Sequence, residues 1–239
     1  MPFLSSTEAT MGYGRPRQPA AQAGVNKGGS LLFAGTATSN LSIANDIDFQ
    51  NGTGDFTIEW FQYSTTTGNS FPRIFSIGSY SGQSIAVSQE GSDSSRTFYA
   101  WISSARSMES GQNYSNTWIH FAVCRSGTNL KVFKNGTQIG TTQINSTNFN
   151  DTTNALRIGN ETSASLGAAF KGYITNFRWT KGAALYTANF TRPSAPLTAT
   201  ANTSLLLLAT TSGSAATDSS GKGKTVTNNS VTWSSLTPF

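Results

Sequence analysis

Apolar and polar residues alternate along most of the chain from about residue 30 onward. The clearest case is the run in which Phe56, Ile58 and Trp60 alternate with Thr57 and Glu59. Successive side chains of a strand point to opposite faces, so this run predicts a strand with an apolar inner face and a more polar outer face. On this interpretation Glu59 is a solvated strand residue.

Segments of this kind recur at short intervals, separated by Gly, Asn, Asp and Ser. We expect strands at residues 30–33, 41–43, 55–63, 73–77, 84–88, 97–102, 118–125, 129–134, 137–140, 155–159, 171–180, 204–209 and 225–233. At most one helical turn is expected, around Gly182 to Tyr186. Strands without helices must bury their faces against one another, which predicts an all-β fold with two antiparallel sheets in a jelly-roll sandwich.

The sharpest local signal is the pair Asn135-Gly136 between two alternating runs, residues 130–134 and 137–140. Both central positions of a type I′ turn have positive φ, which Asn and Gly tolerate. This pattern predicts a two-residue β-hairpin.

The first 26 residues differ in composition from the rest. Gly and Pro are frequent around Tyr13, Arg15, Pro16 and Arg17, and no period of a strand or a helix is visible. Proline fixes φ and removes a donor, so such a segment gains order mainly by lying on a neighbour. We therefore divide the chain into an extended arm for anchoring or oligomerisation, residues 1–26, and a sandwich domain, residues 27–239. A loose terminal tail is the alternative.

Charge and cysteine content exclude several classes of protein. Lys and Arg number 16 against 11 Asp and Glu, but the basic residues are scattered singly and no helix is available to enter a groove, so nucleic-acid binding is not expected. Cys124 is the only cysteine, which excludes an internal disulfide and a cysteine-based zinc site. No signal peptide and no apolar run of about 18 residues is visible, so we expect no membrane insertion.

Four parts of the chain together resemble the laminin-G-like members of the concanavalin-A-like lectin and glucanase superfamily. In order they are Ser30–Phe33 leading to Leu41–Ile43, Gly54–Trp60, Trp118–Val123 leading to Val132–Gly136, and Leu156–Gly159 leading to Phe170–Arg178. Their order and spacing agree with the family over about residues 27–237. The resemblance implies the same concanavalin-A-like sandwich.

Two further strings, Thr180–Pro193 and Tyr13–Pro16, resemble domains common in phages and large aquatic viruses. The resemblance implies a virion surface component, such as a capsid decoration, a fibre or a tail-associated protein, that displays a lectin-like domain for attachment to host glycans. Its expected partners are other virion proteins, held through the arm, and further copies of itself in a symmetric homo-oligomer. The alternative is a purely architectural capsid cement or assembly subunit that binds no sugar.

Sugar binding needs exposed aromatic rings that stack on a sugar, with amide and hydroxyl groups nearby. Tyr99 and Trp101 fall on the strand face opposite to Phe98 and Ala100, and Tyr80 and Tyr114 fall in polar loops. These four aromatic residues are the candidate glycan contacts. Packing of Tyr99 and Trp101 on a neighbouring protomer or loop is the alternative.

Catalysis is not expected. Glycosidases of the resembling superfamily present Glu-x-Asp-x-Glu on one strand, a pattern that is missing from this sequence. Asp55 and Glu59 share a strand face but lie about 13 Å apart, too far for a retaining or inverting pair. His120 and Cys124 are also about 13 Å apart along one strand, too far for a Cys-His pair. We interpret His120 and Cys124 as packing or interfacial residues.

Calcium is the one cofactor worth considering, because laminin-G-like domains sometimes bind it at a sandwich rim. Asp46, Asp48 and Asp151 are the candidate ligands, since calcium prefers oxygen donors. Asp is equally expected in turns, where its side chain bonds to nearby backbone N–H groups.

Overall fold

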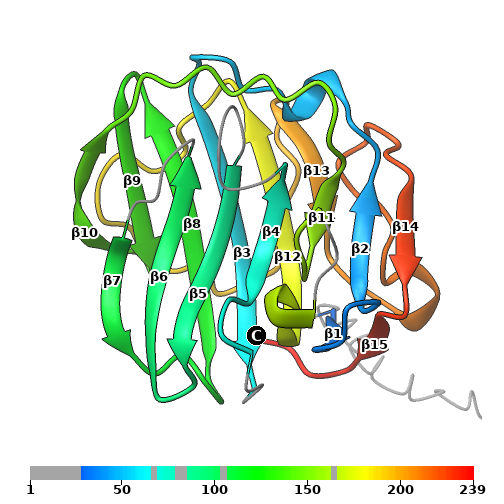
Figure 1. Ribbon diagram of the computed structural model, residues 1–239. Helices are drawn as coiled ribbons and strands as arrows, with labels where there is room; N and C mark the ends of the chain where they lie inside the picture. Colours follow the sequence, from blue (N-terminus) through cyan, green and yellow to red (C-terminus); the bar gives the residue numbers. More distant parts are fainter. Residues whose placement is uncertain (1–27, 66–68, 79–84, 103–106, 163–165) are drawn as a thin grey trace, which may run out of the picture.

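Two antiparallel β-sheets packed face to face make up the computed structural model (Figure 1). The structure describes residues 28–239 apart from 66–68, 79–84, 103–106 and 163–165. The all-β jelly-roll sandwich expected from the alternation is thus confirmed. The arm, residues 1–26, lies outside the described residues, so the division of the chain into arm and sandwich stays a prediction.

The first sheet has eight strands. They are β1 (Ser30–Ala34), β3 (Phe56–Ser64), β8 (Trp118–Ser126), β9 (Asn129–Lys134), β10 (Thr137–Ile144), β12 (Lys171–Lys181), β13 (Thr203–Leu207) and β15 (Thr232–Ser234). Their order is β10-β9-β8-β3-β12-β1-β15, and β13 also pairs with β12.

The second sheet has seven strands. They are β2 (Asn40–Ile43), β4 (Arg73–Ile77), β5 (Ile85–Ser92), β6 (Ser95–Ile102), β7 (Ser107–Gln112), β11 (Leu156–Ile158) and β14 (Val226–Asn229), in the order β14-β2-β11-β4-β5-β6-β7. The described helical structure consists of three 3₁₀ turns, η1 (Ile47–Phe49), η2 (Leu166–Ala168) and η3 (Ser212–Ser214).

The core between the sheets is rich in aromatic side chains. Trp60 of β3 is fully buried, and its ring centre lies 5.7 Å from that of Phe121 and 5.5 Å from that of Phe75, which belongs to the opposite sheet. Each such ring removes a large apolar surface from water, so these contacts join the two sheets. Each sheet also has an outer face that points away from this core, and the two outer faces are covered differently.

The predicted hairpin is confirmed. Lys134 pairs with Thr137, and the two residues between them, Asn135 and Gly136, have φ angles of 50° and 83°. Positive φ at both positions is the geometry of a type I′ turn, whose twist matches that of the flanking strands.

The prediction of one strand over residues 225–233 is wrong. The chain turns at Ser230, where φ is 57°, and the Asn228 side chain hydrogen-bonds both the N–H and the carbonyl of Val231. As a result β14 joins the seven-stranded sheet and β15 joins the eight-stranded sheet. Strand β7 was not predicted, and residues 182–186 form no helical turn.

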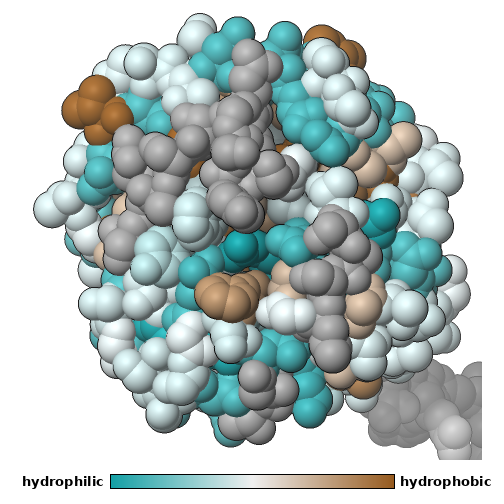
Figure 2. Space-filling view, viewed as in Figure 1, coloured by the Kyte–Doolittle hydropathy of each residue, from teal (hydrophilic) through white to brown (hydrophobic). Residues whose placement is uncertain are grey.

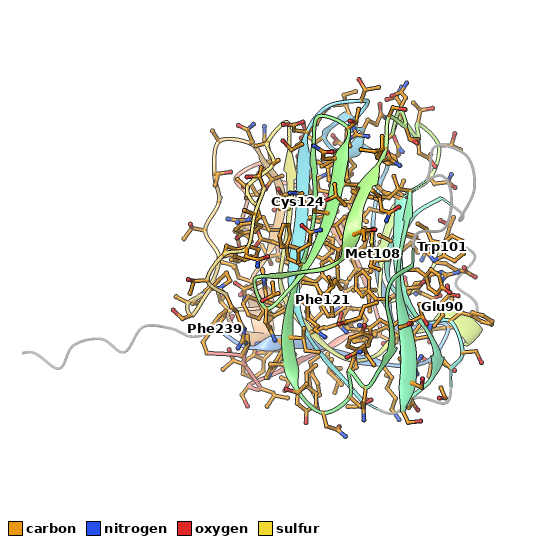
Figure 3. All side chains as sticks on the ribbon, turned by 90° about the vertical axis from the view of Figure 1, so that its left-hand side faces the viewer. Glu90, Trp101, Met108, Phe121, Cys124 and Phe239 are labelled. Atoms are coloured by element: carbon orange, nitrogen blue, oxygen red, sulfur yellow. The ribbon has the colours of Figure 1, made fainter. Side chains whose placement is uncertain are left out.

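A segment after β12, residues 182–200 (the strap), lies over the outer face of the eight-stranded sheet. Within it Tyr186 and Phe190 stack with ring centres 3.6 Å apart and pack on a cluster that includes Cys124. The Phe190 N–H donates to the Gly136 carbonyl (2.8 Å). Figure 3 shows the sheets from the side, with Cys124 toward the outer side covered by the strap and Trp101 and Glu90 toward the opposite outer side.

The strap corrects the prediction for Glu59. Glu59 does point away from the core between the sheets, as the alternation indicates, but its exposed fraction is 0%. Thr57, on the same face, is equally buried and donates a hydrogen bond to the Ala183 carbonyl of the strap (3.0 Å). The outer face of β3 is therefore a second buried layer and not a solvated surface.

Candidate functional site

The outer face of the seven-stranded sheet contains a pocket of about 390 Å³ (the Trp101 pocket). It lies where β4, β5 and β6 meet the loop around η2, and its lining residues are Phe71, Arg73, Glu90, Trp101, Glu161, Gly167 and Ala168. Figure 2 shows this face, with a hollow of hydrophilic, teal atoms near its centre beside a hydrophobic, brown group.

The strand register explains why Trp101 reaches this face. Phe98, Ala100 and Ile102 of β6 are fully buried in the core, so the alternate residues Tyr99 and Trp101 point outward. Both of these are partly exposed, and their ring centres lie 5.4 Å apart.

A hydrogen bond from the indole to β5 fixes the orientation of the ring. Ser88 lies opposite Tyr99 in the register, and its hydroxyl accepts a hydrogen bond from Trp101 Nε1 (2.8 Å) and donates one to Glu90 Oε1 (2.8 Å). A ring held in this way keeps little rotamer freedom to lose when a ligand stacks on it.

Charged groups lie beside the indole. Arg73 donates to Glu90 Oε1 (2.5 Å), its Nε lies 3.8 Å from Glu161 Oε2, and its guanidinium carbon lies 5.6 Å from the centre of the Trp101 ring. Arg73 therefore lies between two carboxylates. Carboxylates accept hydrogen bonds from hydroxyl groups, a guanidinium donates them, and an indole face packs on C–H groups. This combination can hold a small polyhydroxylated ligand.

The four candidate glycan contacts have different outcomes. Trp101 lines the pocket and Tyr99 lies next to it. Tyr114 is only 1% exposed, because it packs edge-on against Phe121 in the core, so its predicted exposure is wrong. Tyr80 lies outside the described residues, as do Tyr13, Arg15, Pro16 and Arg17 of the arm.

Sequence reasoning missed Phe71, Arg73, Glu90 and Glu161 as pocket residues. Glu90 shares the polar face of β5 with Ser88 and lies opposite Thr97 of β6, so the alternation could have placed it on the same face of the sheet as Trp101. Glu161 arrives from a distant loop after β11, and no periodic signal connects it with β6.

The three candidate calcium ligands serve other partners. Asp46 Oδ2 and Asp48 Oδ2 lie 2.6 Å and 2.7 Å from Lys224 Nζ, which therefore occupies the position between them. The hydrogen bond from Lys224 is the main reason why the pKa of Asp46 lies below its ordinary value. The carboxylate of Asp151 accepts from the backbone of Thr153 and from Asn154 within its own turn.

This arrangement does not fit a calcium ion, which needs six to eight oxygen ligands. Among the described residues, no group of three or more His, Cys, Asp or Glu residues is arranged to hold a metal ion. In the same part of the chain, no helix is long and apolar enough to span a membrane.

A second group of chemically active side chains lies beneath the strap. Glu59 accepts hydrogen bonds from Arg178 Nε (2.9 Å) and from the hydroxyl of Tyr186 (3.0 Å), and its Oε2 lies 3.0 Å from His120 Nε2. Burial alone raises the pKa of Glu59, but the His120 hydrogen bond and the Arg178 charge outweigh it and lower the pKa overall. Since Glu59 and His120 are both fully buried, we assign this cluster to folding.

Cys124 lies in the same layer. Its thiol donates to the hydroxyl of Thr57 (3.5 Å), and burial raises its pKa to about 12. His120 bonds to Glu59 instead, so the structure gives the histidine and the cysteine separate partners, and a thiol with so high a pKa is a poor nucleophile.

The chain was compared with known families and structures. Residues 34–185, more than half of the chain, match the family described as the Concanavalin A-like lectin/glucanases superfamily. No curated protein matches the chain in sequence.

Two solved structures of similar fold are a candidate carbohydrate-binding protein from Bacteroides ovatus and a heptameric SAP-like pentraxin from Limulus polyphemus. The first has a TM-score of 0.65 and 12% identity over 87% of this chain and 59% of its own, so this chain spans less than two thirds of its length. The second has a TM-score of 0.52 and 17% identity over 68% of this chain and 79% of its own. At these identities the likeness concerns the fold alone. With the family match, it confirms the resemblance seen in the sequence, and the chain belongs to the laminin-G-like part of the Concanavalin A-like lectin/glucanases superfamily.

Proposed function

We propose that this lectin-like domain binds a glycan in the Trp101 pocket and does not turn it over. The observation that supports the proposal is the oriented indole of Trp101 beside the Arg73 guanidinium and two carboxylates. The pocket volume of about 390 Å³ lies within the range of sites for small ligands. Because the carboxylates of Glu90 and Glu161 line the pocket and carboxylates accept hydrogen bonds from sugar hydroxyl groups, we expect a neutral sugar as the ligand.

A glycan array with the full chain, followed by calorimetry on the best neutral sugar, tests this proposal. Trp101→Ala removes the stacking surface and should weaken binding by about tenfold or more, equivalent to about 1.4 kcal/mol. The control is Tyr173→Ala, since Tyr173 is a partly exposed aromatic residue on the other sheet; it should leave binding unchanged. Thermal melts confirm that both variants fold. Equal binding by the Trp101→Ala variant, or no glycan bound by the wild type, would reject the proposal.

We further propose that the protein is a virion surface component that displays this domain to host glycans, as the resemblance of Tyr13–Pro16 and Thr180–Pro193 to viral proteins implies. Residues 1–26 would anchor the domain to another virion protein, and repeated copies in a homo-oligomer would turn weak sugar binding into avidity. Deletion of residues 2–24 should leave a folded sandwich that no longer enters particles. Normal incorporation of this truncated chain would reject the role of the arm.

The alternative is a capsid cement that binds no sugar. It predicts that the assembled protein gives no hit on a glycan array and that particles lose stability when the protein is deleted. The array therefore separates attachment from cement directly.

Glycoside hydrolysis is a second candidate for the Trp101 pocket, because Glu90 and Glu161 both line it. Hydrolysis needs one carboxyl group that gives a proton and one that stays ionised. Here Arg73 contacts both carboxylates and Ser88 also donates a hydrogen bond to Glu90, so both already serve as partners within the protein, and we prefer binding. A sensitive assay across glucans and galactans decides: activity that disappears in both Glu90→Gln and Glu161→Gln variants would establish the hydrolase.

A further inference from the structure

A second hollow on the outer face of the seven-stranded sheet has a different chemistry from the Trp101 pocket. This groove of about 600 Å³ (the Arg157 groove) runs across β14, β2 and β11. Its lining consists of short polar side chains and one cation: Thr38, Asn40, Ser42, Arg157, Thr227, Asn228, Asn229 and Ser230. Hydroxyl and amide groups in a groove of this size suit a sugar.

The sheet holds Arg157 in place. β11 is an interior strand, and Arg157 pairs with Ser42 of β2 on one side and with Ser76 of β4 on the other. One terminal nitrogen of the guanidinium donates to Asn40 Oδ1 (2.8 Å), and the same oxygen accepts from Asn229 (3.0 Å). Asn40 is only 2% exposed, so this support is rigid.

Arg157 makes no ion pair with any residue that the structure describes. Arg157 Nε is buried and has no hydrogen-bond partner among the described residues. The ion pairs found in the same part of the chain involve Arg73, Arg96, His120, Lys134, Arg178 and Lys224, and none involves Arg157. A cation without a carboxylate partner, set in a polar groove, leaves the site with an unbalanced positive charge.

Arg178 shows what such an edge can bind. Its Nε and one terminal nitrogen both donate to the carboxylate of Glu59. In Arg157 the matching Nε is buried, so the donor left for a ligand is the terminal nitrogen that does not bind Asn40. A carboxylate that reaches this nitrogen forms a charge-assisted hydrogen bond, which is stronger than a bond between neutral groups.

We propose that the Arg157 groove is a second sugar site, specific for the carboxylate of an acidic sugar such as a uronic or a sialic acid. The inference rests on the proposed carbohydrate binding in general but not on the Trp101 pocket. The two sites then differ in their charged groups: Glu90 and Glu161 line the Trp101 pocket, whereas the Arg157 groove presents a cation that attracts an anion.

The test is calorimetry on the full chain with four probes: trigalacturonate and 3′-sialyllactose as acidic sugars, and galactotriose and lactose as their neutral counterparts. We expect at least one acidic sugar to bind about tenfold or more tightly than its counterpart, with an affinity that falls as salt rises. The acidic probe that binds shows whether the site takes the carboxylate of a uronic acid or of a sialic acid. Sodium sulfate is a fifth probe. If sulfate competes as well as the acidic sugar binds, the site accepts any anion, and the sugar assignment is overturned.

Variants separate the two sites. Arg157→Gln should remove the preference for the acidic sugar and leave neutral binding at the Trp101 pocket intact. Arg157→Lys should restore the preference only partly, because its single nitrogen cannot use the separate, fixed positions by which the guanidinium binds Asn40 and faces the ligand. Ser42→Asp keeps the arginine but places a carboxylate on the paired residue of β2, and it should abolish acidic binding as well. Trp101→Ala should do the reverse and weaken neutral binding alone.

The outcomes for the two sites are distinguishable. If neither the wild type nor any variant binds a neutral sugar while acidic binding is retained, the Trp101 pocket is rejected and the Arg157 groove is kept. Equal affinity for acidic and neutral sugars in the wild type, or unchanged acidic binding in both Arg157→Gln and Ser42→Asp, would overturn the inference.

Discussion

Glu59 of β3 and Arg178 of β12 lie directly opposite each other in the sheet register and form an ion pair beneath the strap. The carboxylate is fully buried, and Tyr186 of the strap donates its hydroxyl to the second carboxylate oxygen (3.0 Å). The pair therefore does two things at once. It satisfies two charges that the strap shields from water, and it connects the strap to the sheet.

Loss of one member of this pair should be costly. Glu59→Gln leaves the Arg178 cation without its counter-charge, and breaking a buried pair in this way typically destabilises a protein by about 3–5 kcal/mol. The measurement is the free energy of unfolding from urea titration. The control is Asp55→Asn, since the Asp55 carboxylate makes an exposed hydrogen bond to the Gly127 N–H; we expect a loss of about 1 kcal/mol or less.

Replacement of both charges distinguishes the pair from simple packing. The double variant Glu59→Met with Arg178→Met removes both charges and both desolvation penalties, so it should be more stable than Glu59→Gln alone. A Glu59→Gln variant within about 1 kcal/mol of the wild type would show that the ion pair contributes little.

Acid should unfold the protein through its carboxylates. Burial raises the pKa of Glu59, but His120 and Arg178 outweigh it, and the pKa values of Asp46, Asp151 and Asp218 are also lowered. A carboxyl group with a lowered folded-state pKa contributes stability above its unfolded pKa and loses it as pH falls through the folded value. The ordinary values are 4.5 for Glu59 and 3.8 for the aspartates.

We therefore expect the free energy of unfolding to fall as the pH drops below about 4.5, the ordinary pKa of Glu59. Urea titrations at a series of pH values measure it, and Glu59→Gln should show a shallower decline. Two results would contradict the role of Glu59 in acid unfolding. One is a free energy of unfolding that rises on acidification below this pH, and the other is a decline that is equally steep in the Glu59→Gln variant and in the wild type.

Much of the fold could be predicted because alternation reports which face of a strand is apolar. The predicted ranges 73–77 and 129–134 coincide with β4 and β9, and Asn135-Gly136 forms the expected turn. Both results depend on local signals, namely side-chain period and the backbone freedom of two residues.

What lies against the polar face of a strand could not be predicted in the same way. Glu59 looked solvated, because its burial depends on Tyr186 of the strap, 127 positions further along the chain. The Trp101 pocket has the same origin: Trp101 was a candidate from alternation alone, whereas Glu161 meets Arg73 only through the path of a loop. Local patterns define strand faces, but tertiary contacts decide whether those faces become surface, core or site.

Gly136 should be far less replaceable than an ordinary turn glycine. A Cβ atom at Gly136 would lie 1.9 Å from the Phe190 carbonyl oxygen, so Gly136→Ala would displace the strap as well as strain a positive φ of 83°. Gly127 also has a positive φ, 57°, but a Cβ there would meet nothing within 4 Å. We expect Gly127→Ala to cost about 1–2 kcal/mol and Gly136→Ala clearly more, measured by urea unfolding. Equal losses of unfolding free energy in the two variants would mean that the strap can move away at Phe190 without destabilising the protein.

Calcium should have no effect through the Asp46 and Asp48 carboxylates, because Lys224 Nζ already lies between them. A ligand present at 100 times its dissociation constant stabilises a protein by about 2.7 kcal/mol. We expect melting temperatures in millimolar calcium and in EDTA to agree within about 1 °C, well below the several degrees that such binding would produce. A clear rise in calcium would show that Lys224 is displaced by the ion.

Cys124 offers a direct measure of strap opening, since it is the only cysteine of the chain. Cys124 is 1% exposed, and burial raises the pKa of its thiol to about 12. Only the thiolate reacts with iodoacetamide or a disulfide reagent, so the closed protein should react far more slowly than a free cysteine peptide at the same pH. Labelling therefore requires the strap, with Tyr186 and Phe190, to move away from β8.

Weaker strap contacts should accelerate the labelling. Tyr186→Phe removes the hydrogen bond to Glu59 while keeping the ring, and Phe190→Ala removes a stacked ring. We expect both variants to label faster than the wild type, and the urea dependence of the rate shows whether the strap opens locally or with the whole sandwich. The control is Tyr173→Ala, which lies outside the strap and should label at the wild-type rate. Rapid labelling of the wild type, equal to that of a free thiol, would mean that the strap does not cover Cys124 in solution.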